Sequence, residues 1–205
     1  YTYTPSYCEE NVFHLCQKLK EDRIVDAEGM DLFVIFISND KKQVPLWHQK
    51  ASHRAEGAVL WDYHVICVQR RNDANSPDLV WDLDTTLPFP SHFASYLSNA
   101  IRPSFHLFPD YQRLFRVVHA PLYLQHFASD RRHMKDSAGD WIAPPPTYDP
   151  IKSPDGVVHN LHEYMEIHSW EETKGEVNVI DIVLNQKLGA VLNQDKFAEF
   201  FSKLF

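Results

Sequence analysis

The spacing of apolar residues along the chain predicts where its first helix and strands lie. From Cys8 to about Asp22, apolar side chains recur every three or four residues, as they do on one face of an α-helix. Residues 31–38 instead form a continuous apolar run rich in β-branched and aromatic side chains, which predicts a buried strand. The turn-forming residues 39–42 then separate this strand from a short second strand over residues 44–47.

The rest of the chain mixes further strands with short helices. Strands are predicted over residues 58–69, 79–84 and 115–118. Helices are predicted over residues 91–101, 109–114, 121–127, 160–168 and 194–204. Residues 70–77 join the first two of these strands as a hairpin, the proline-rich residues 131–151 form a loop, and residues 171–187 form an extended hairpin or an insertion. We therefore predict a single α+β domain over residues 1–205, with helices flanking a mostly antiparallel sheet.

Composition and charge exclude several classes of protein. Hydrophobic residues make up 44% of the chain, which is too many for a disordered protein. The 28 acidic residues outnumber the 20 Lys and Arg, so the formal net charge is −8, and we expect no nucleic-acid partner because such a surface repels phosphate. The longest apolar run, residues 32–37, is far shorter than the roughly 20 residues that cross a bilayer, so we expect no membrane span.

The cysteine content indicates a reducing environment. The chain has three cysteines, Cys8, Cys16 and Cys67, an odd number without metal-type spacing. No charged-then-apolar leader precedes Cys8, so we expect no secretory signal. We therefore expect free thiols and a location in the cytosol or the nucleus.

Cys8 is the candidate nucleophile. In the first turn of a helix it faces unpaired backbone N–H groups and the positive end of the helix dipole, which favour a thiolate over a thiol. The same N–H groups can hold an oxyanion during acyl transfer. The alternative is that Cys8 is a small buried hydrophobic residue, as most free cysteines are.

His64 and Asp82 strengthen the catalytic interpretation. If the predicted hairpin folds symmetrically about Asp73, His64 faces Asp82, with their β-carbons about 4.5 to 5.5 Å apart. A carboxylate there accepts the imidazole N–H, fixes its tautomer and stabilises the imidazolium that forms when Cys8 loses its proton. The alternative is a core histidine beside an unrelated carboxylate. Because His64 alone among the 12 histidines has a carboxylate predicted opposite it, we interpret the three residues as a catalytic triad.

Further acidic residues surround this predicted site. The same register places Asp62 opposite Asp84, and Glu10 lies close to the nucleophile. Facing carboxylates repel each other, so our hypothesis is that this patch receives a substrate ammonium group. In the alternative, which is slightly favoured, Asp84 bonds the turn at Thr85 and Thr86, and Asp62 pairs with an arginine.

The remaining polar residues do not complete a cofactor site. His48 with His53, and His159 with His162 and His168, lack the cysteine or carboxylate that would finish a compact set of zinc ligands, so we expect them to be solvated or capping. The chain has six glycines and no glycine-rich phosphate loop. We expect no metal and no organic cofactor.

Strings of residues in and around the triad resemble those of the protein N-terminal glutamine amidohydrolase family. These strings are Tyr7-Cys8-Glu9-Glu10-Asn11, Phe36-Ile37-Ser38-Asn39, Trp61-Asp62-Tyr63-His64-Val65, Asp82-Leu83-Asp84-Thr85, Leu87-Pro88-Phe89-Pro90, Phe127-Ala128-Ser129-Asp130-Arg131, His133-Met134-Lys135-Asp136 and Pro144-Pro145-Pro146. The resemblance is strong from Tyr7 to about Leu161 and weaker from Gly189 onward. The chain departs from the family pattern in residues 171–187, which are longer and more charged, and mildly at Trp81.

The resemblance implies a papain- and transglutaminase-like fold and a monomeric enzyme whose partners are proteins or peptides with a free N-terminal Gln. Such an enzyme converts this Gln to Glu with release of ammonia, and the product can then be arginylated and degraded in the N-degron pathway. In the family the matching cysteine, histidine and aspartate form the triad, which here means Cys8, His64 and Asp82. The cysteine attacks the side-chain carboxamide, and a thioester is formed and hydrolysed.

Other functions are compatible with the same residues. A cysteine peptidase or a transglutaminase uses the same triad order and differs in its acyl donor and acceptor. A binding module that recognises N-terminal Gln without turnover is a different class, although it has no need of an intact triad. Residues 131–151 form either one wall of the substrate pocket or a structural strap.

Overall fold

An antiparallel sheet forms the centre of the fold. The computed structural model describes residues 1–54, 57–71, 73, 76–175 and 178–202, and within them six strands pair in the order β6-β5-β4-β1-β7-β8. The strands are β1 (Leu32–Ser38), β4 (His64–Gln69), β5 (Leu79–Trp81), β6 (Ser91–His92), β7 (Leu114–His119) and β8 (Ala190–Asn193). All neighbouring pairs are antiparallel, which confirms the predicted sheet type.

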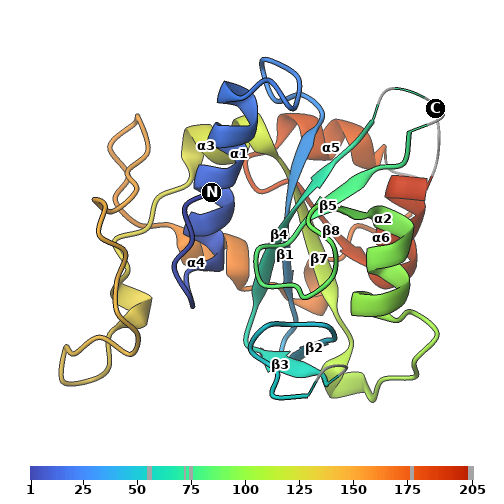
Figure 1. The fold of residues 1–205 in the computed structure, drawn as a ribbon, viewed down its shortest axis with the longest axis horizontal. Coiled ribbons are helices and arrows are strands. Elements are labelled where there is room, and N and C mark those ends of the chain that lie inside the picture. The colour runs from blue at the N-terminus through green and yellow to red at the C-terminus, as the bar shows by residue number, and fades with distance from the viewer. Residues whose placement is uncertain (55–56, 72, 74–75, 176–177, 203–205) are drawn as a thin grey trace.

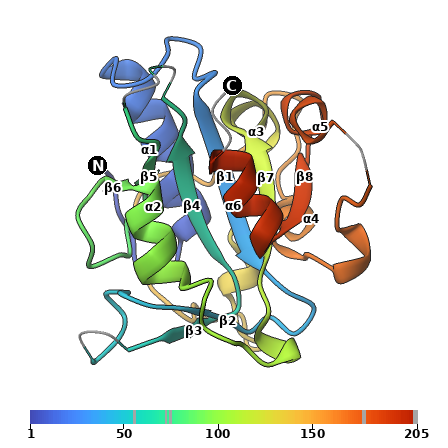
Figure 2. The ribbon, with the colours of Figure 1, turned by 90° about the vertical axis from the view of Figure 1, so that its right-hand side faces the viewer.

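Helices cover both faces of this sheet. The helices are α1 (Cys8–Glu21), α2 (Phe93–Tyr96), α3 (Ala120–His126), α4 (Leu161–Met165), α5 (Val179–Asn185) and α6 (Gln194–Ser202), with a π-helical turn at Leu97–Ile101. One face carries α1, α3 and α4, and the other carries α2 and α6 (Figures 1 and 2). The predicted α+β class with helices flanking the sheet is therefore confirmed. The likeness to the papain and transglutaminase fold stays a prediction.

Strand β1 lies between two hydrophobic layers. Its side chains alternate, so that Leu32, Val34 and Phe36 join the cluster under α1, and Phe33, Ile35 and Ile37 join the cluster under α2 and α6. All seven of its residues are buried. A strand covered on both faces carries a continuous apolar run, which is why this strand was predictable.

Helix α1 sets the position of Cys8. Its predicted apolar face is confirmed, because Val12, Leu15 and Leu19 are each 1% exposed or less. The side chain of Asn11 holds the segment before the helix, accepting from the Thr4 N–H and donating to the Thr4 carbonyl, each at 2.8 Å. The helix therefore begins at Cys8 with the preceding chain fixed beside it.

The predicted hairpin differs from the structure in two ways. The strand predicted over residues 58–69 is broken at Asp62 and Tyr63, and its first part, β3 (Val59–Trp61), pairs instead with β2 (Val44–Leu46) in a separate small sheet. The β4–β5 ladder pairs Cys67 with Trp81, so the predicted register is wrong by two residues. Part of the connection over residues 70–77 lies outside the described residues.

The second half of the chain contains the largest error. Residues 171–187 are not an extended hairpin, because they include helix α5, while positions 176–177 lie outside the described residues. Strand β8, which follows, was not predicted. Gly189 leads into it at φ 58°, where a Cβ would collide with the Val117 carbonyl, so glycine allows β8 to approach β7. The helix predicted over residues 91–101 instead comprises β6, α2 and the π-helical turn.

None of the helices in the described part of the chain has the length and apolarity that a bilayer crossing requires.

Candidate active site

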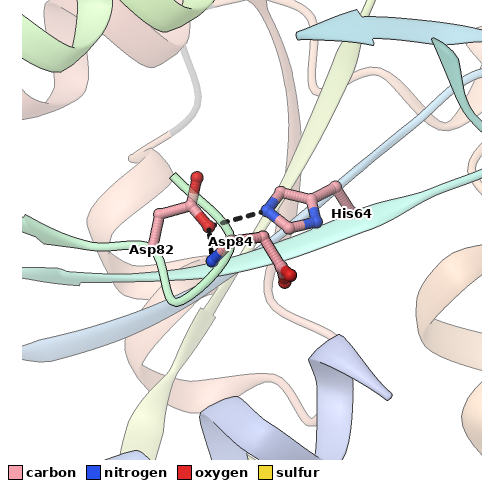
Figure 3. Close-up of side chains that lie close together, drawn as sticks. All are labelled: His64, Asp82 and Asp84. Carbon is pink, nitrogen blue, oxygen red and sulfur yellow. Dashed lines mark hydrogen bonds and ion pairs between the residues drawn. The ribbon is translucent and has the colours of Figure 1, made fainter. Parts of the chain in front are cut away.

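His64 and Asp82 form a buried pair. The imidazole Nε2 lies 2.9 Å from Asp82 Oδ1, and both side chains are 0% exposed (Figure 3). The pair does not arise from the predicted ladder position, since β5 ends at Trp81. Instead the chain turns after Trp81, and the Asp84 backbone N–H donates to Asp82 Oδ1 at 2.9 Å. This turn brings the carboxylate to the first residue of β4.

Both oxygens of Asp82 are held by donors. In addition to the two donors on Oδ1, Oδ2 accepts from the Tyr96 hydroxyl at 2.8 Å and from Gln49 Nε2 at 3.2 Å. His64, Asp82 and Asp84 offer ligand atoms within 4.8 Å of one another, as a metal site would. A cation would have to displace hydrogen bonds at Asp82, however, so this arrangement suits the orientation of an imidazole better than ligation.

Burial and charge act in opposite directions on this pair. Burial alone would lower the pKa of His64, but the neighbouring Asp82 carboxylate raises that pKa above its ordinary value. Burial alone would raise the pKa of Asp82, but His64 and the donors around the carboxylate lower it. The pair therefore favours an ionised aspartate that stabilises a protonated imidazole.

The other ring nitrogen of His64 is available for chemistry. Nδ1 has no hydrogen-bond partner among the described residues, and it faces away from Asp82 (Figure 3). The Trp61 ring stacks on the imidazole, with centroids 5.0 Å apart and planes at 20°. The ring is thus fixed on one edge and one face, while Nδ1 can accept or release a proton.

Cys8 lies beside the same strand. It is the first residue of α1, its thiol lies 3.7 Å from Glu9 Oε2, and the Val65 backbone N–H donates to its sulfur. The charge of Asp84 acts on both the Cys8 thiol and the His64 imidazole, so both groups lie near this carboxylate. The structure thus pairs His64 with Asp82, and the union of Cys8 with this pair in a triad stays a prediction.

The Cys8 thiol is not poised as a thiolate. Burial raises its pKa well above the ordinary value, the Glu9 and Asp84 carboxylates raise it further, and the Val65 N–H lowers it only in part. Burial first, and the carboxylates second, therefore oppose the thiolate that a helix start favours. Ionisation of Cys8 requires a base that removes its proton.

The assignment of Glu10 to an ammonium site is contradicted. Its carboxylate is fully buried and is bound by Arg131, whose Nε and Nη2 both donate to it at 2.9 to 3.2 Å. A carboxylate in a two-pronged ion pair has no charge to offer a second cation. Glu10 instead anchors the loop over residues 131–151 to α1.

Asp84 and Asp62 occupy different environments. Asp84 is 8% exposed, its carboxylate points away from that of Asp82 (Figure 3), and its Oδ1 accepts from the Tyr3 hydroxyl at 2.6 Å. Asp62 is exposed, and its carboxylate accepts from the Tyr63 backbone N–H at 2.9 Å. The two residues do not face each other across a ladder, so that prediction is wrong. The hydrogen bonds that their carboxylates accept also differ from the contacts expected in the alternative interpretation.

The chain was compared with known proteins. The profile of the N-terminal glutamine amidase family matches residues 3–201. The chain belongs to this family. Two plant proteins named protein N-terminal glutamine amidohydrolase align with all 205 residues: the Arabidopsis thaliana protein is 55% identical over 93% of its length, and the Oryza sativa subsp. indica protein 53% over 88%. A Drosophila melanogaster protein of that name is 45% identical over 152 residues, 74% of this chain and 72% of its own length.

Membership confirms the family resemblance and the expectation that the chain is an amidohydrolase. Several residues of this amidase site escaped the sequence analysis. Glu9 adjoins the candidate nucleophile Cys8, and its position next to that residue at a helix start was the one available signal. Tyr96 and Gln49 hold Asp82, and Tyr63 holds Glu9, but they come from distant segments that no local spacing connects.

Proposed function

We propose that this amidohydrolase converts the N-terminal Gln of proteins or peptides to Glu and releases ammonia, through a thioester on Cys8. The observation that carries the proposal is the buried His64–Asp82 pair, whose Nδ1 has no partner among the described residues, on a strand packed against the helix that Cys8 begins. The family match over residues 3–201 and the names of the plant relatives support the choice of substrate.

Acylation begins with the removal of the Cys8 proton. His64 acts as the base, because the burial of the thiol and the nearby carboxylates disfavour a free thiolate. The sulfur attacks the carboxamide carbon, and backbone N–H groups at the start of α1 stabilise the oxyanion. His64 then passes its proton to the nitrogen, the C–N bond breaks, and ammonia leaves. Asp82 keeps the imidazole aligned throughout.

Deacylation uses the same imidazole. His64 takes a proton from water, the resulting hydroxide attacks the thioester, and the C–S bond breaks. The proton on His64 returns to the Cys8 sulfur, which restores the thiol. The Gln side chain leaves as the carboxyl group of Glu.

We propose that the substrate ammonium group binds near Asp84, with Asp62 at the edge of the site. The buried Asp84 carboxylate acts on Cys8 and His64 together, and an ammonium group there would cancel charge that raises the Cys8 pKa. Binding of the correct substrate would thereby assist ionisation of the thiol. We expect Asp84→Asn to raise KM for free N-terminal Gln, whereas equal losses on free and acetylated peptides would contradict the ammonium role.

One assay separates this reaction from its alternatives. Peptides that begin with Gln, Asn or acetyl-Gln are incubated with the enzyme, and ammonia and peptide mass are followed. We expect equimolar ammonia and a gain of about one dalton on free Gln alone. Backbone cleavage would indicate a peptidase, cross-linking to an amine a transglutaminase, and binding without turnover a reader; each outcome contradicts the proposal.

The cellular setting is part of the proposal. The three cysteines are free, and the Cys16 and Cys67 sulfurs lie 3.7 Å apart as thiols, which suits a reducing cytosol or nucleus. A Glu produced at a protein N-terminus there would feed the N-degron pathway. The order of nucleophile, base and aspartate supports a papain- and transglutaminase-like relationship.

A further inference from the structure

A second group of titratable side chains begins beside the nucleophile. Glu9 is fully buried, and its Oε2 accepts from the Tyr63 hydroxyl at 2.9 Å and lies 3.7 Å from the Cys8 sulfur. Its Oε1 accepts no hydrogen bond within the described residues, and His133 Nε2 lies 3.4 Å from it. The mechanism above assigns no role to this carboxylate or to this imidazole.

Three imidazole rings lead from Glu9 toward the surface. His133 stacks with His159, their centroids 6.4 Å apart, and His159 stacks with His162 at 5.8 Å. His159 Nδ1 also lies 3.2 Å from Asp130 Oδ1. The row runs from a carboxylate that is 0% exposed, through side chains that are 16% and 10% exposed, to the exposed His162.

His133 is unusual in having both ring nitrogens buried without a hydrogen-bond partner among the described residues. A buried polar atom without a hydrogen-bond partner costs free energy of folding, so the two unpaired nitrogens of His133 indicate a functional role. An imidazole that is not fixed in one tautomer can accept a proton at one nitrogen and release another from the second. His133 directs its Nε2 toward Glu9, and one face of its ring stacks on His159.

The proposed reaction leaves one proton to be removed from the site. Hydrolysis of the thioester yields a carboxylic acid, while the other hydrogen of the attacking water returns to the Cys8 sulfur through His64. Ammonia leaves as the neutral base. The new acid, with an ordinary pKa of about 4.3, must therefore lose its proton near the Cys8 sulfur and beside the Glu9 carboxylate.

We propose that Glu9 accepts the proton of the newly formed carboxyl group and that His133, which is 16% exposed, passes it on to solvent. The product O–H bond breaks as an O–H bond forms on Glu9, and the proton then moves to His133 Nε2 while another leaves from Nδ1. After transfer, the product and Glu9 are both anionic and repel each other, which drives product release. Glu9 is thus a catalytic residue, and His133 acts through it.

This inference rests on the proposed function, because it requires an acyl-enzyme on Cys8. The test is the variant His133→Ala, studied by rapid quench with a Gln peptide. We expect an unchanged first burst of ammonia, which reports acylation, and a later turnover that is slower by about tenfold or more. Added imidazole should fill the vacated space and restore turnover in proportion to its concentration.

Two further variants distinguish proton transfer by His133 from a purely structural role of this residue. His133→Gln keeps a hydrogen-bond donor toward Glu9 but cannot relay protons, so it should be slow and insensitive to imidazole. His168→Ala removes an exposed histidine outside the row, which pairs with Asp40, and should behave as wild type. Thermal unfolding of each variant checks that the fold is kept.

The inference is overturned if His133→Ala turns over as fast as wild type, if imidazole does not restore a lost rate, or if the ammonia burst is lost with the turnover. A different result would contradict the proposed function instead. If neither wild type nor His133→Ala carries a covalent adduct on Cys8 during turnover, the thioester itself is wrong.

Discussion

At the residue scale, the chemistry depends on the negative charge that surrounds the Cys8 thiol. Glu9 and Asp84 both raise its pKa, and no cation of the described chain is among the groups that act on it most strongly. The site therefore keeps its nucleophile protonated until His64 and the substrate act together. A buried thiol of this kind is protected from oxidation and alkylation in the resting enzyme.

Glu9→Gln should make Cys8 more reactive toward iodoacetamide at neutral pH. The substitution removes the charge that contributes most to the raised pKa after burial, so that pKa falls and the alkylation profile moves to lower pH. Alkylation rates measured across pH test this shift. Glu21→Gln, on the exposed side of the same helix, is the matched control, and a Glu9→Gln profile that coincides with it would be contrary to the prediction.

Asp82→Asn should lower kcat by about 10² to 10⁴. The Asp82 carboxylate raises the pKa of His64, so its removal lowers that pKa and moves the acid limb of the kcat/KM profile to lower pH. The limb reports His64, because the active form has a neutral imidazole and a protonated thiol. Asp195→Asn, at an exposed position of α6, serves as the control. A profile with an unmoved acid limb would refute the pairing of His64 with Asp82.

The pairing of His64 with Asp82 could be predicted from the sequence, but the surroundings of Cys8 could not. Neighbouring positions on a helix point about 100° apart, so whether Glu9 or Glu10 faces the site depends on tertiary contacts. The Glu10 carboxylate is bound by Arg131, which is 121 positions away in the chain. Glu9 is left to face Cys8. No local pattern encodes that choice.

At the scale of elements, the active site is built where helix α1 meets the loop over residues 131–151. The Glu10–Arg131 pair and the bond from the Tyr7 hydroxyl to the Ala143 carbonyl join the two. The same loop carries His133. The prolines and the buried arginine of this loop therefore fix one side of the site. Of the two interpretations of residues 131–151, the structural strap describes this anchoring.

Arg131→Met should reduce the free energy of unfolding by about 3 to 5 kcal/mol, because it leaves the Glu10 carboxylate buried and uncompensated. Urea unfolding measures the change. Lys18→Met, which removes an exposed ion pair of α1 with Asp22, should leave the free energy of unfolding nearly unchanged. Adding Glu10→Met to the Arg131→Met variant should recover much of the loss, and a double variant that is less stable than the single one would contradict this account.

Elements with a regular apolar pattern, such as α1 and β1, were easier to predict than irregular ones. Helix α5 was missed although Val179, Ile182 and Val183 have helical spacing, since the charged residues before it resembled an insertion. The break at Asp62 was not predictable, because it depends on β3 pairing with β2 rather than continuing into β4. The hairpin register was wrong for a related reason, as the turn after Trp81 replaces the end of the ladder.

At the scale of the whole molecule, the acidic net charge and the six-stranded central sheet are consistent with an enzyme that binds the chain ends of its substrates. We predict a monomer of 23.9 kDa in solution, measured by light scattering after size exclusion. Phe108 and Trp170 are the most exposed large hydrophobic side chains among the described residues, at 74% and 75%. A stable dimer that Trp170→Ser or Phe108→Ser dissociates would disprove the prediction.

The central claim is that Cys8 forms a covalent bond with the substrate. Intact-protein mass spectrometry of the enzyme, quenched in acid during turnover of a Gln peptide, tests this most directly. We predict an adduct equal to the peptide minus ammonia, located on Cys8 and absent from Cys8→Ala, which releases no ammonia. Ammonia release by Cys8→Ala, or an adduct on another residue, would contradict the account.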